Sequence, residues 1–226
     1  MSPRPYRLGQ RRSATEATRA RILAATRDLL IGVGGPGVFS IDAVANEAGV
    51  ARMTVYYQFG SRRGLLEALM DDLAARGGMG KLAEVFHLSD PIEALGALIR
   101  AFVHFWATDR IVTRRLRSFA VLDPEFQQVR ARDEWRRDHL RKLLKRVVRD
   151  LGPQAAQAFE DAVDILQTLT SFETFDTLAS NTRTEDDVAS LIWRLATAAL
   201  GLEAEPISSS DKAPRSTRAR RKLQGA

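Results

Sequence analysis

Apolar residues recur at helical spacing along nearly the whole chain of 226 residues, and no stretch alternates convincingly between apolar and polar side chains. A period of about 3.6 residues places apolar side chains on one face of a helix, whereas a half-buried strand needs a period of two. At this length, an apolar content of 45% is enough to build a proper hydrophobic core. The sequence therefore predicts an all-α fold.

Capping residues divide this helical pattern into separate elements. A capping box, in which a serine or threonine is followed three residues later by an acidic residue, opens a helix at S13-A-T-E16 and another at T184-E-D-D187. Further N-caps are predicted at Ser40, Ser61, Asp90 and Asp123. We expect helices over residues 13–31, 41–48, 51–58, 61–77, 91–107, 111–121, 124–150, 154–179 and 184–202.

Charge is unevenly divided along the chain. Residues 1–63 carry 10 basic and 4 acidic side chains, residues 64–203 carry 18 and 22, and residues 204–226 carry 6 and 2. A basic N-terminal segment on a mildly acidic body indicates that the first segment meets a polyanion. We interpret residues 1–12 as a flexible basic arm and residues 204–226 as a disordered basic tail.

Several classes of function are disfavoured by composition and spacing. The chain has no cysteine, its three histidines are dispersed, and the glycines at 32, 34 and 37 follow a helix rather than a strand. No serine lies in the context of a catalytic nucleophile, and no stretch is apolar and long enough for a signal peptide or a membrane span. We therefore expect a cytoplasmic protein that is not an enzyme and has no metal or cofactor.

Residues 41–58 have the pattern of a helix-turn-helix motif. Ala45 is small where two helices would cross, Gly49 can take a positive φ in the turn, and Val55 can hold the second helix against the core. The outward side chains of that second helix and of the turn after it would then meet the major groove and the DNA backbone. These candidate DNA-binding residues are Arg52, Met53, Thr54, Tyr56, Tyr57, Ser61 and Arg62.

The same region resembles the DNA-binding domain of TetR/AcrR-type transcriptional regulators, through TRARILAATRDLL at 18–30 and SIDAVANEAGVARMTVYYQFGSRRGLLEALM at 40–70. The resemblance implies DNA contacts for Arg52, Thr54, Tyr56, Tyr57 and Arg62. Three residues depart from the family pattern, namely Ala51, Gln58 and Gly64. Because glycine costs about 1 kcal/mol relative to alanine inside a helix, Gly64 predicts a looser start of the helix that follows Ser61.

The resemblance further implies a helix-turn-helix domain over residues 13–62 and a ligand-binding and dimerisation domain over residues 63–203. Residues 61–76 are then expected to be the one rod joining the two. Candidate ligand-binding residues are the aromatic side chains Phe86, Phe102, Phe105, Trp106 and Phe119. Candidate residues for a homodimer interface, on the last two helices, are Phe159, Val163, Leu166, Leu191, Ile192 and Leu195.

The function expected from these features is sequence-specific binding of double-stranded operator DNA by a regulator, most simply a repressor released by a small, largely apolar inducer. A sequence-tolerant architectural DNA-binding protein is the alternative, for which the basic arm and tail argue. Arginines are also dense at 110–117 and 130–149, but acidic residues interleave with the second group at helix-pair spacing. That pattern indicates a solvated face rather than a second nucleic-acid surface.

Overall fold

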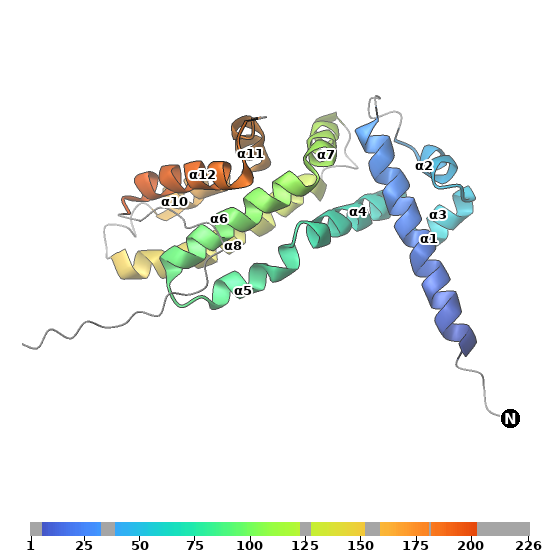
Figure 1. Cartoon of the computed structure of the whole chain (residues 1–226), viewed down its shortest axis with the longest axis horizontal. Helices are drawn as coiled ribbons and strands as arrows, with labels where there is room; N and C mark the ends of the chain where they lie inside the picture. Colours follow the sequence, from blue (N-terminus) through green and yellow to red (C-terminus); the bar gives the residue numbers. More distant parts are fainter. Residues whose placement is uncertain (1–5, 33–38, 123–127, 152–158, 181, 203–226) are drawn as a thin grey trace, which may run out of the picture.

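The structure is a computed structural model that describes residues 6–32, 39–122, 128–151, 159–180 and 182–202, and within these ranges it is helical and has no strand (Figure 1). The helices are α1 (Tyr6–Ile31), α2 (Ile41–Glu47), α3 (Arg52–Phe59), α4 (Arg62–Arg76), α5 (Leu82–His87), α6 (Pro91–Thr108), α7 (Arg110–Leu122), α8 (Gln128–Leu151), α10 (Phe159–Leu169), α11 (Phe172–Leu178) and α12 (Glu185–Leu200). A short 3-10 helix, η2 (Met79–Lys81), precedes α5. The predicted all-α fold is confirmed.

Four of the predicted helix starts are fixed by the expected side chains. The Ser40 hydroxyl accepts a hydrogen bond from the amide of Ala43, and the Ser61 hydroxyl accepts one from the amide of Gly64. Asp90 accepts from the amide of Ile92, with Pro91 in the first turn of α6. At α12 both hydrogen bonds of the Thr184 capping box are present. The predicted cap at Asp123 and the basic tail lie outside the described residues.

Two helix boundaries differ from the prediction. Helix α1 begins at Tyr6, so the backbone of residues 6–12, expected to be a flexible arm, continues the helix. Arg12 pairs with Glu16 one turn later, which supports this extension. The helix predicted over 154–179 is broken, because Ser171 accepts from the amide of Thr174 and starts α11 afresh. Helix α5 and η2 fill a stretch for which no helix was expected.

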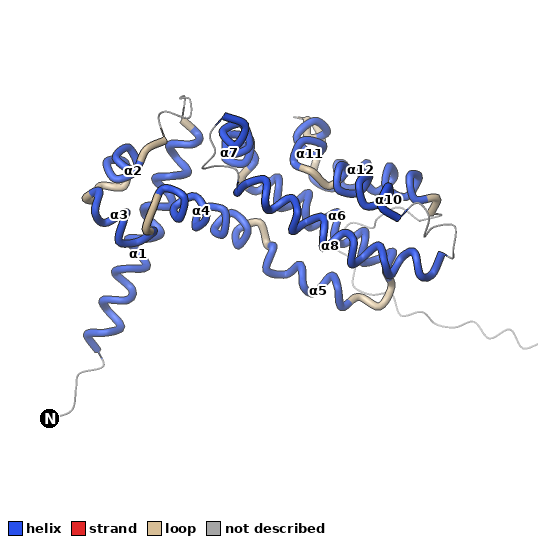
Figure 2. The backbone as a smooth tube through the Cα atoms, turned by 180° about the vertical axis from the view of Figure 1, so that it is seen from behind, coloured by secondary structure: helices blue, strands red, loops and turns tan. Residues whose placement is uncertain are grey.

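The buried side chains form two hydrophobic cores. The first lies among α1, α2, α3 and α4 and includes Ile22, Val44, Val55 and Leu69. The second lies among α6, α8, α10, α11 and α12. Figure 2 shows the two helix groups from behind, with α1, α2 and α3 at one end and α10 and α12 at the other.

The helices around each core form one lobe of the molecule. Helix α7 also belongs to the first core, so the expectation that residues 61–76 alone join the two lobes is wrong. Its Val112, Leu116, Phe119 and Ala120 are buried there, and the helix packs along α1. Helix α4 contacts α6 on its other side. A Cβ added to Gly77 would lie 2.5 Å from Cδ2 of Phe105, so α4 and α6 meet closely where α4 ends. Two helices, α4 and α7, therefore connect the lobes.

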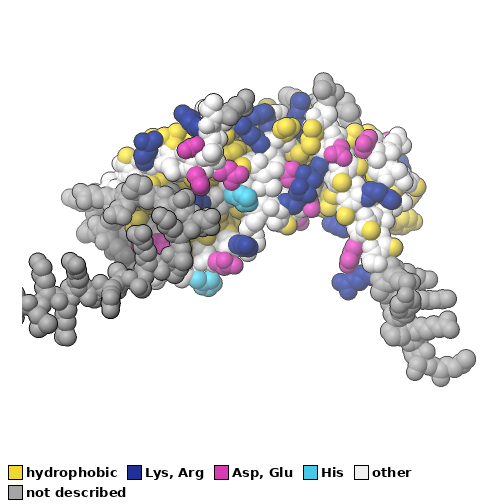
Figure 3. All heavy atoms as spheres, in the orientation of Figure 1, with side chains coloured by type: hydrophobic (Ala, Val, Ile, Leu, Met, Phe, Trp, Pro, Cys, Tyr) yellow, Lys and Arg dark blue, Asp and Glu magenta, His cyan; other side chains and the backbone are white. Residues whose placement is uncertain are grey.

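Several arginines of α7 and α8 form intramolecular ion pairs. Arg110 and Arg114 both pair with Asp176, while Arg137 and Arg141 both approach Glu160. Basic and acidic side chains are correspondingly mixed over the face shown in Figure 3. These pairs agree with the interpretation of a charge-balanced surface. No helix within the described ranges is long and apolar enough to cross a membrane.

Candidate nucleic-acid interface and ligand cavity

The helix-turn-helix motif is built around a glycine turn and a buried valine. Gly49 has a φ of 61°, a conformation that glycine adopts without strain, and the amide of Val50 donates to the Ala45 carbonyl at 2.9 Å. Val55 is fully buried, so α3 is fixed by its inner face. At the far end of α3, the Arg19 guanidinium donates to the Gln58 carbonyl at 3.0 Å and thereby ties α3 to α1.

The outer face of α3 is exposed and apolar. Met53 is 56% exposed, and Tyr57, one helical turn later, is 85% exposed. Tyr56 is half-buried and packs against the first core, as its position about 100° around the helix from Tyr57 requires. Thr54 is also half-buried. The structure thus separates two adjacent tyrosines into one that packs and one that projects from the molecule.

Arg52 is oriented by an acid of the preceding helix. Its Nη1 donates to the two carboxylate oxygens of Asp42 at 2.7 and 2.9 Å, and its Nη2 donates to the Tyr56 hydroxyl at 3.3 Å. The Tyr56 hydrogen bond, followed by the charge of Asp42, raises the pKa of Arg52. Asp42 was not among the candidate residues, because its ten-residue distance from Arg52 has no local spacing rule. The pair holds the guanidinium beside the outer face of α3.

Two further predicted DNA contacts, Arg62 and Ser61, also have structural partners within the chain. The Arg62 guanidinium lies 5.3 Å from the centre of the Phe39 ring and is half-buried, so it is directed into the domain. Ser61 remains exposed, and its hydroxyl caps α4. Among the seven candidate residues, Arg52, Met53, Tyr57 and Ser61 are exposed.

A cavity of about 550 Å³ opens among α4, α6, α7 and α8. Three of the five predicted ligand-binding aromatics line it, namely Phe102, Phe105 and Trp106. The other two do not: Phe119 is buried in the first core, and Phe86 on α5 has its ring edge-on to His139. Helical spacing shows which aromatic side chains share the apolar face of a helix, but it does not show which other helix packs against that face.

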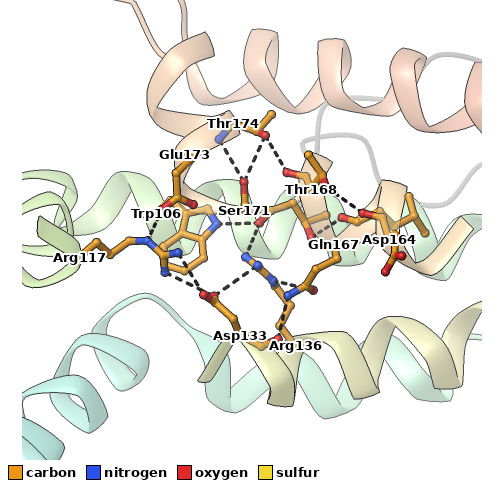
Figure 4. Close-up of polar contacts among 12 residues, drawn as sticks. Trp106, Arg117, Asp133, Arg136, Asp164, Gln167, Thr168, Ser171, Glu173 and Thr174 are labelled. Atoms are coloured by element: carbon orange, nitrogen blue, oxygen red, sulfur yellow. Dashed lines mark hydrogen bonds and ion pairs between the residues drawn. The ribbon is translucent and has the colours of Figure 1, made fainter. Parts of the chain in front are cut away.

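One wall of the cavity is polar, and Figure 4 shows how its side chains converge. The Thr170 carbonyl accepts from the Trp106 indole nitrogen at 3.0 Å and from Arg136 Nη1 at 2.9 Å. Asp133 lies between two guanidinium groups, 3.0 Å from Arg117 Nη2 and 3.3 Å from Arg136 Nη2. These residues come from α6, α7, α8 and the break between α10 and α11.

The candidate interface residues on α10 and α12 fall into two groups. Val163, Leu166 and Ile192 are buried within the single chain and belong to its second core. Leu195 is 45% exposed, while Phe159 and Leu191 are half-buried. Ile165, which was not a candidate, is exposed on α10. Helical period identifies apolar stripes, but it cannot separate a face that packs inside the chain from one that remains open.

Residues 22–69 match the family model described as bacterial regulatory proteins, tetR family. The matched stretch contains the helix-turn-helix and the start of α4. The likeness to this family is therefore carried by the helix-turn-helix domain, within residues 22–69. No curated protein matches the sequence.

Solved structures share the TetR-like fold over most of the chain. A TetR-like transcriptional regulator from Rhodococcus sp. RHA1 aligns with a TM-score of 0.63 and 22% identity, covering 81% of this chain and 96% of its own. A transcriptional regulator from Rhodococcus sp. Rha1 aligns with a TM-score of 0.60 and 19% identity, covering 83% and 99%. The likeness therefore extends from the matched DNA-binding domain through the second lobe.

The polar wall of the cavity is the part of the site that the sequence analysis missed. Asp133 and Arg136 lie in the segment interpreted as a solvated face, because acids and arginines alternate there at helical spacing, and Arg117 ends the other arginine-dense segment. Arg136 is nevertheless only 3% exposed. Trp135 beside it gave no useful signal, because Trp135 is itself 46% exposed.

Proposed function

We propose that this chain is a homodimeric transcriptional regulator of the TetR type that reads operator DNA with α3 and acts as a repressor. The observation that carries the proposal is the outer face of α3, where Tyr57 and Met53 project from a helix that is otherwise held by the core. Arg52 lies beside them, with Asp42 directing its guanidinium. An arginine at such a place can donate two hydrogen bonds to guanine, and a tyrosine hydroxyl can bind phosphate.

The DNA contacts can be tested once an operator has been selected from genomic fragments bound by the native protein. We expect Tyr57→Ala to weaken binding to every sequence, because a phosphate contact positions the protein without reading bases. Arg52→Ala should cost about 1 to 3 kcal/mol and relax preference at one base pair. Fluorescence anisotropy with the operator and with single-base variants measures both effects.

Ile111→Ala is the matched control, since Ile111 is also a large exposed apolar residue but lies on α7. It should bind operator as the native protein does. Normal binding by both α3 variants would contradict the proposed reading helix. Equal affinity of the native protein for selected and random DNA would instead favour an architectural DNA-binding protein.

We further propose that a small molecule in the cavity releases the operator. Helices α4 and α7 both line the cavity and both pack in the core that holds α2 and α3. A ligand that shifts either helix must therefore act on the DNA-binding helices. Releasing DNA about a hundredfold requires a coupling free energy of about 2.7 kcal/mol, which lies in the usual range, and the operator must weaken ligand binding by the same factor.

A further inference from the structure

Charge is distributed unequally around the cavity. Four arginines and two carboxylates line it, which gives a net charge of +2; they are Arg63, Arg117, Arg132, Arg136, Glu67 and Asp133. Arg63 and Glu67 pair with each other across one turn of α4. The surplus positive charge therefore gathers on the wall formed by α7 and α8. The walls formed by α4 and α6 carry the apolar side chains Met70, Leu73, Phe105 and Trp106.

Arg136 is the most deeply buried of these charges. Neutral groups satisfy two of its nitrogens, because Nε donates to the Gln167 amide oxygen at 3.2 Å and Nη1 donates to the Thr170 carbonyl. The Phe102 and Trp106 rings each lie 5.8 Å from its guanidinium carbon. Burial lowers the pKa of Arg136 to about 10, against the attraction of Asp133. The side chain is thus a cation near neutral pH, in a place that solvates a cation poorly.

Asp133 is the acidic residue of this wall that lines the cavity, and Arg117 and Arg136 both pair with it. Arg117 also pairs with Glu173, but Glu173 is exposed and does not line the cavity. Arg132 pairs with Asp71, which likewise faces solvent outside the cavity. Inside the cavity, three arginines therefore face one acid. Arg136 is the buried one among them, and it shares its carboxylate with Arg117, so an anion that approaches Arg136 would gain a charge-assisted hydrogen bond.

We propose that the ligand of this cavity is an amphiphilic anion, with an apolar body among the aromatic and methionine side chains and a carboxylate-like group against Arg117, Arg132 and Arg136. The proposal rests on the proposed function, in which the cavity is the ligand site. A cationic amphiphile does not fit, because Asp133 is already shared by two arginines and Glu67 is paired with Arg63. A neutral molecule would form no hydrogen bond between a cation and an anion with these arginines, and such bonds are the stronger ones.

The head-group charge can be tested with three probes that share one apolar body: decanoate, decan-1-ol and decylamine at neutral pH. Binding to the native full-length protein without DNA is followed by tryptophan fluorescence, since Trp106 and Trp135 line the cavity, and by calorimetry. Because hydrogen bonds to charged groups are stronger than neutral ones, decanoate should bind at least about tenfold more tightly than decan-1-ol. Decylamine should bind most weakly of the three.

Two substitutions should change this preference in opposite directions. Arg132→Gln removes a partly exposed positive charge from the wall and should weaken decanoate binding severalfold. Asp133→Asn removes the competing acid and should tighten decanoate binding, while decan-1-ol responds little to either change. Arg114→Gln is the control, since Arg114 is an arginine of α7 that does not line the cavity. Thermal melts confirm that each variant is folded.

The proposal is overturned if decan-1-ol or decylamine binds as tightly as decanoate, or if none of the three binds below about 1 mM, the limit of weak association. It is also overturned if Arg132→Gln and Asp133→Asn leave decanoate binding unchanged. These measurements use the free protein, so they are independent of operator binding. Loss of DNA binding in the α3 variants remains the separate test of the proposed function.

Discussion

At the scale of single residues, Gly64 shows how a local rule can give the wrong sign. Its helical position predicted a looser start of α4, which alanine would improve by about 1 kcal/mol. In the structure, a Cβ at this position would lie 2.1 Å from the Phe59 carbonyl oxygen. The glycine therefore allows the end of α3 to approach the first turn of α4. Propensity could not reveal this, because the contact depends on how the chain folds back at Gly60.

We accordingly expect Gly64→Ala to destabilise the protein by about 1 to 3 kcal/mol, as for overpacking at a tight contact. Urea unfolding followed by circular dichroism measures the change. Gly80→Ala serves as the matched control, because an added Cβ there meets nothing within 4 Å. It should be nearly neutral. A Gly64→Ala variant as stable as the native protein, or more so, would show that the helix-propensity argument was right.

Residue types also predicted the placement of α3 better than the cavity. Gly49, Ala45 and Val55 specify the turn and the inner face of α3 by local rules, so the exposure of Met53 and Tyr57 follows from the sequence. Arg136 followed no such rule. Its burial depends on the Thr170 carbonyl, which arrives from a helix end 34 residues later in the chain. Long-range partners of this kind are invisible to spacing.

At the scale of helices, Asp109 connects three elements of the two lobes. It lies between α6 and α7, and its carboxylate accepts from Arg27 on α1 and, at 3.2 Å, from Arg76 at the end of α4. The Asp109 side chain is 10% exposed and that of Arg27 is 18% exposed. The sequence offered no sign of this cluster, since Arg27 and Asp109 are 82 positions apart.

We expect Asp109→Asn to lower the free energy of unfolding by about 2 to 3 kcal/mol, between the values for exposed and buried ion pairs, because it leaves the Arg27 charge half-buried and unmatched. Urea unfolding of Asp109→Asn, Arg27→Gln and the double variant gives the coupling energy. Asp138→Asn is the control, since Asp138 is an exposed acid in a weak pair with Arg141. If the two single effects simply add, the cluster does not act as a unit.

At the scale of the whole molecule, reading an operator with two half-sites requires two copies of α3 at a fixed separation of about 34 to 36 Å. Helices α1, α2 and α3 lie at one end of the molecule, and α10 and α12 lie at the other (Figure 1). A dimer formed through α10 and α12 would leave both copies of α3 free. Their separation would then depend on how each first lobe sits on its second lobe, which α4, α7 and Asp109 determine.

The proposed dimer surface can be tested by placing a charge on it. Leu195 is the most exposed large apolar side chain of α12, and Ile165 is exposed on the adjoining α10. In a twofold-symmetric interface each substitution occurs twice, so Leu195→Arg would bring two charges into one apolar contact. We expect this variant to sediment as a monomer and to bind operator far more weakly, because one copy of α3 reaches only one half-site. Ile111→Arg adds the same charge on α7 and should remain dimeric. A Leu195→Arg protein that stays dimeric with full operator affinity would place the interface elsewhere, and the separation of the reading helices would then have to be set by another face of the molecule.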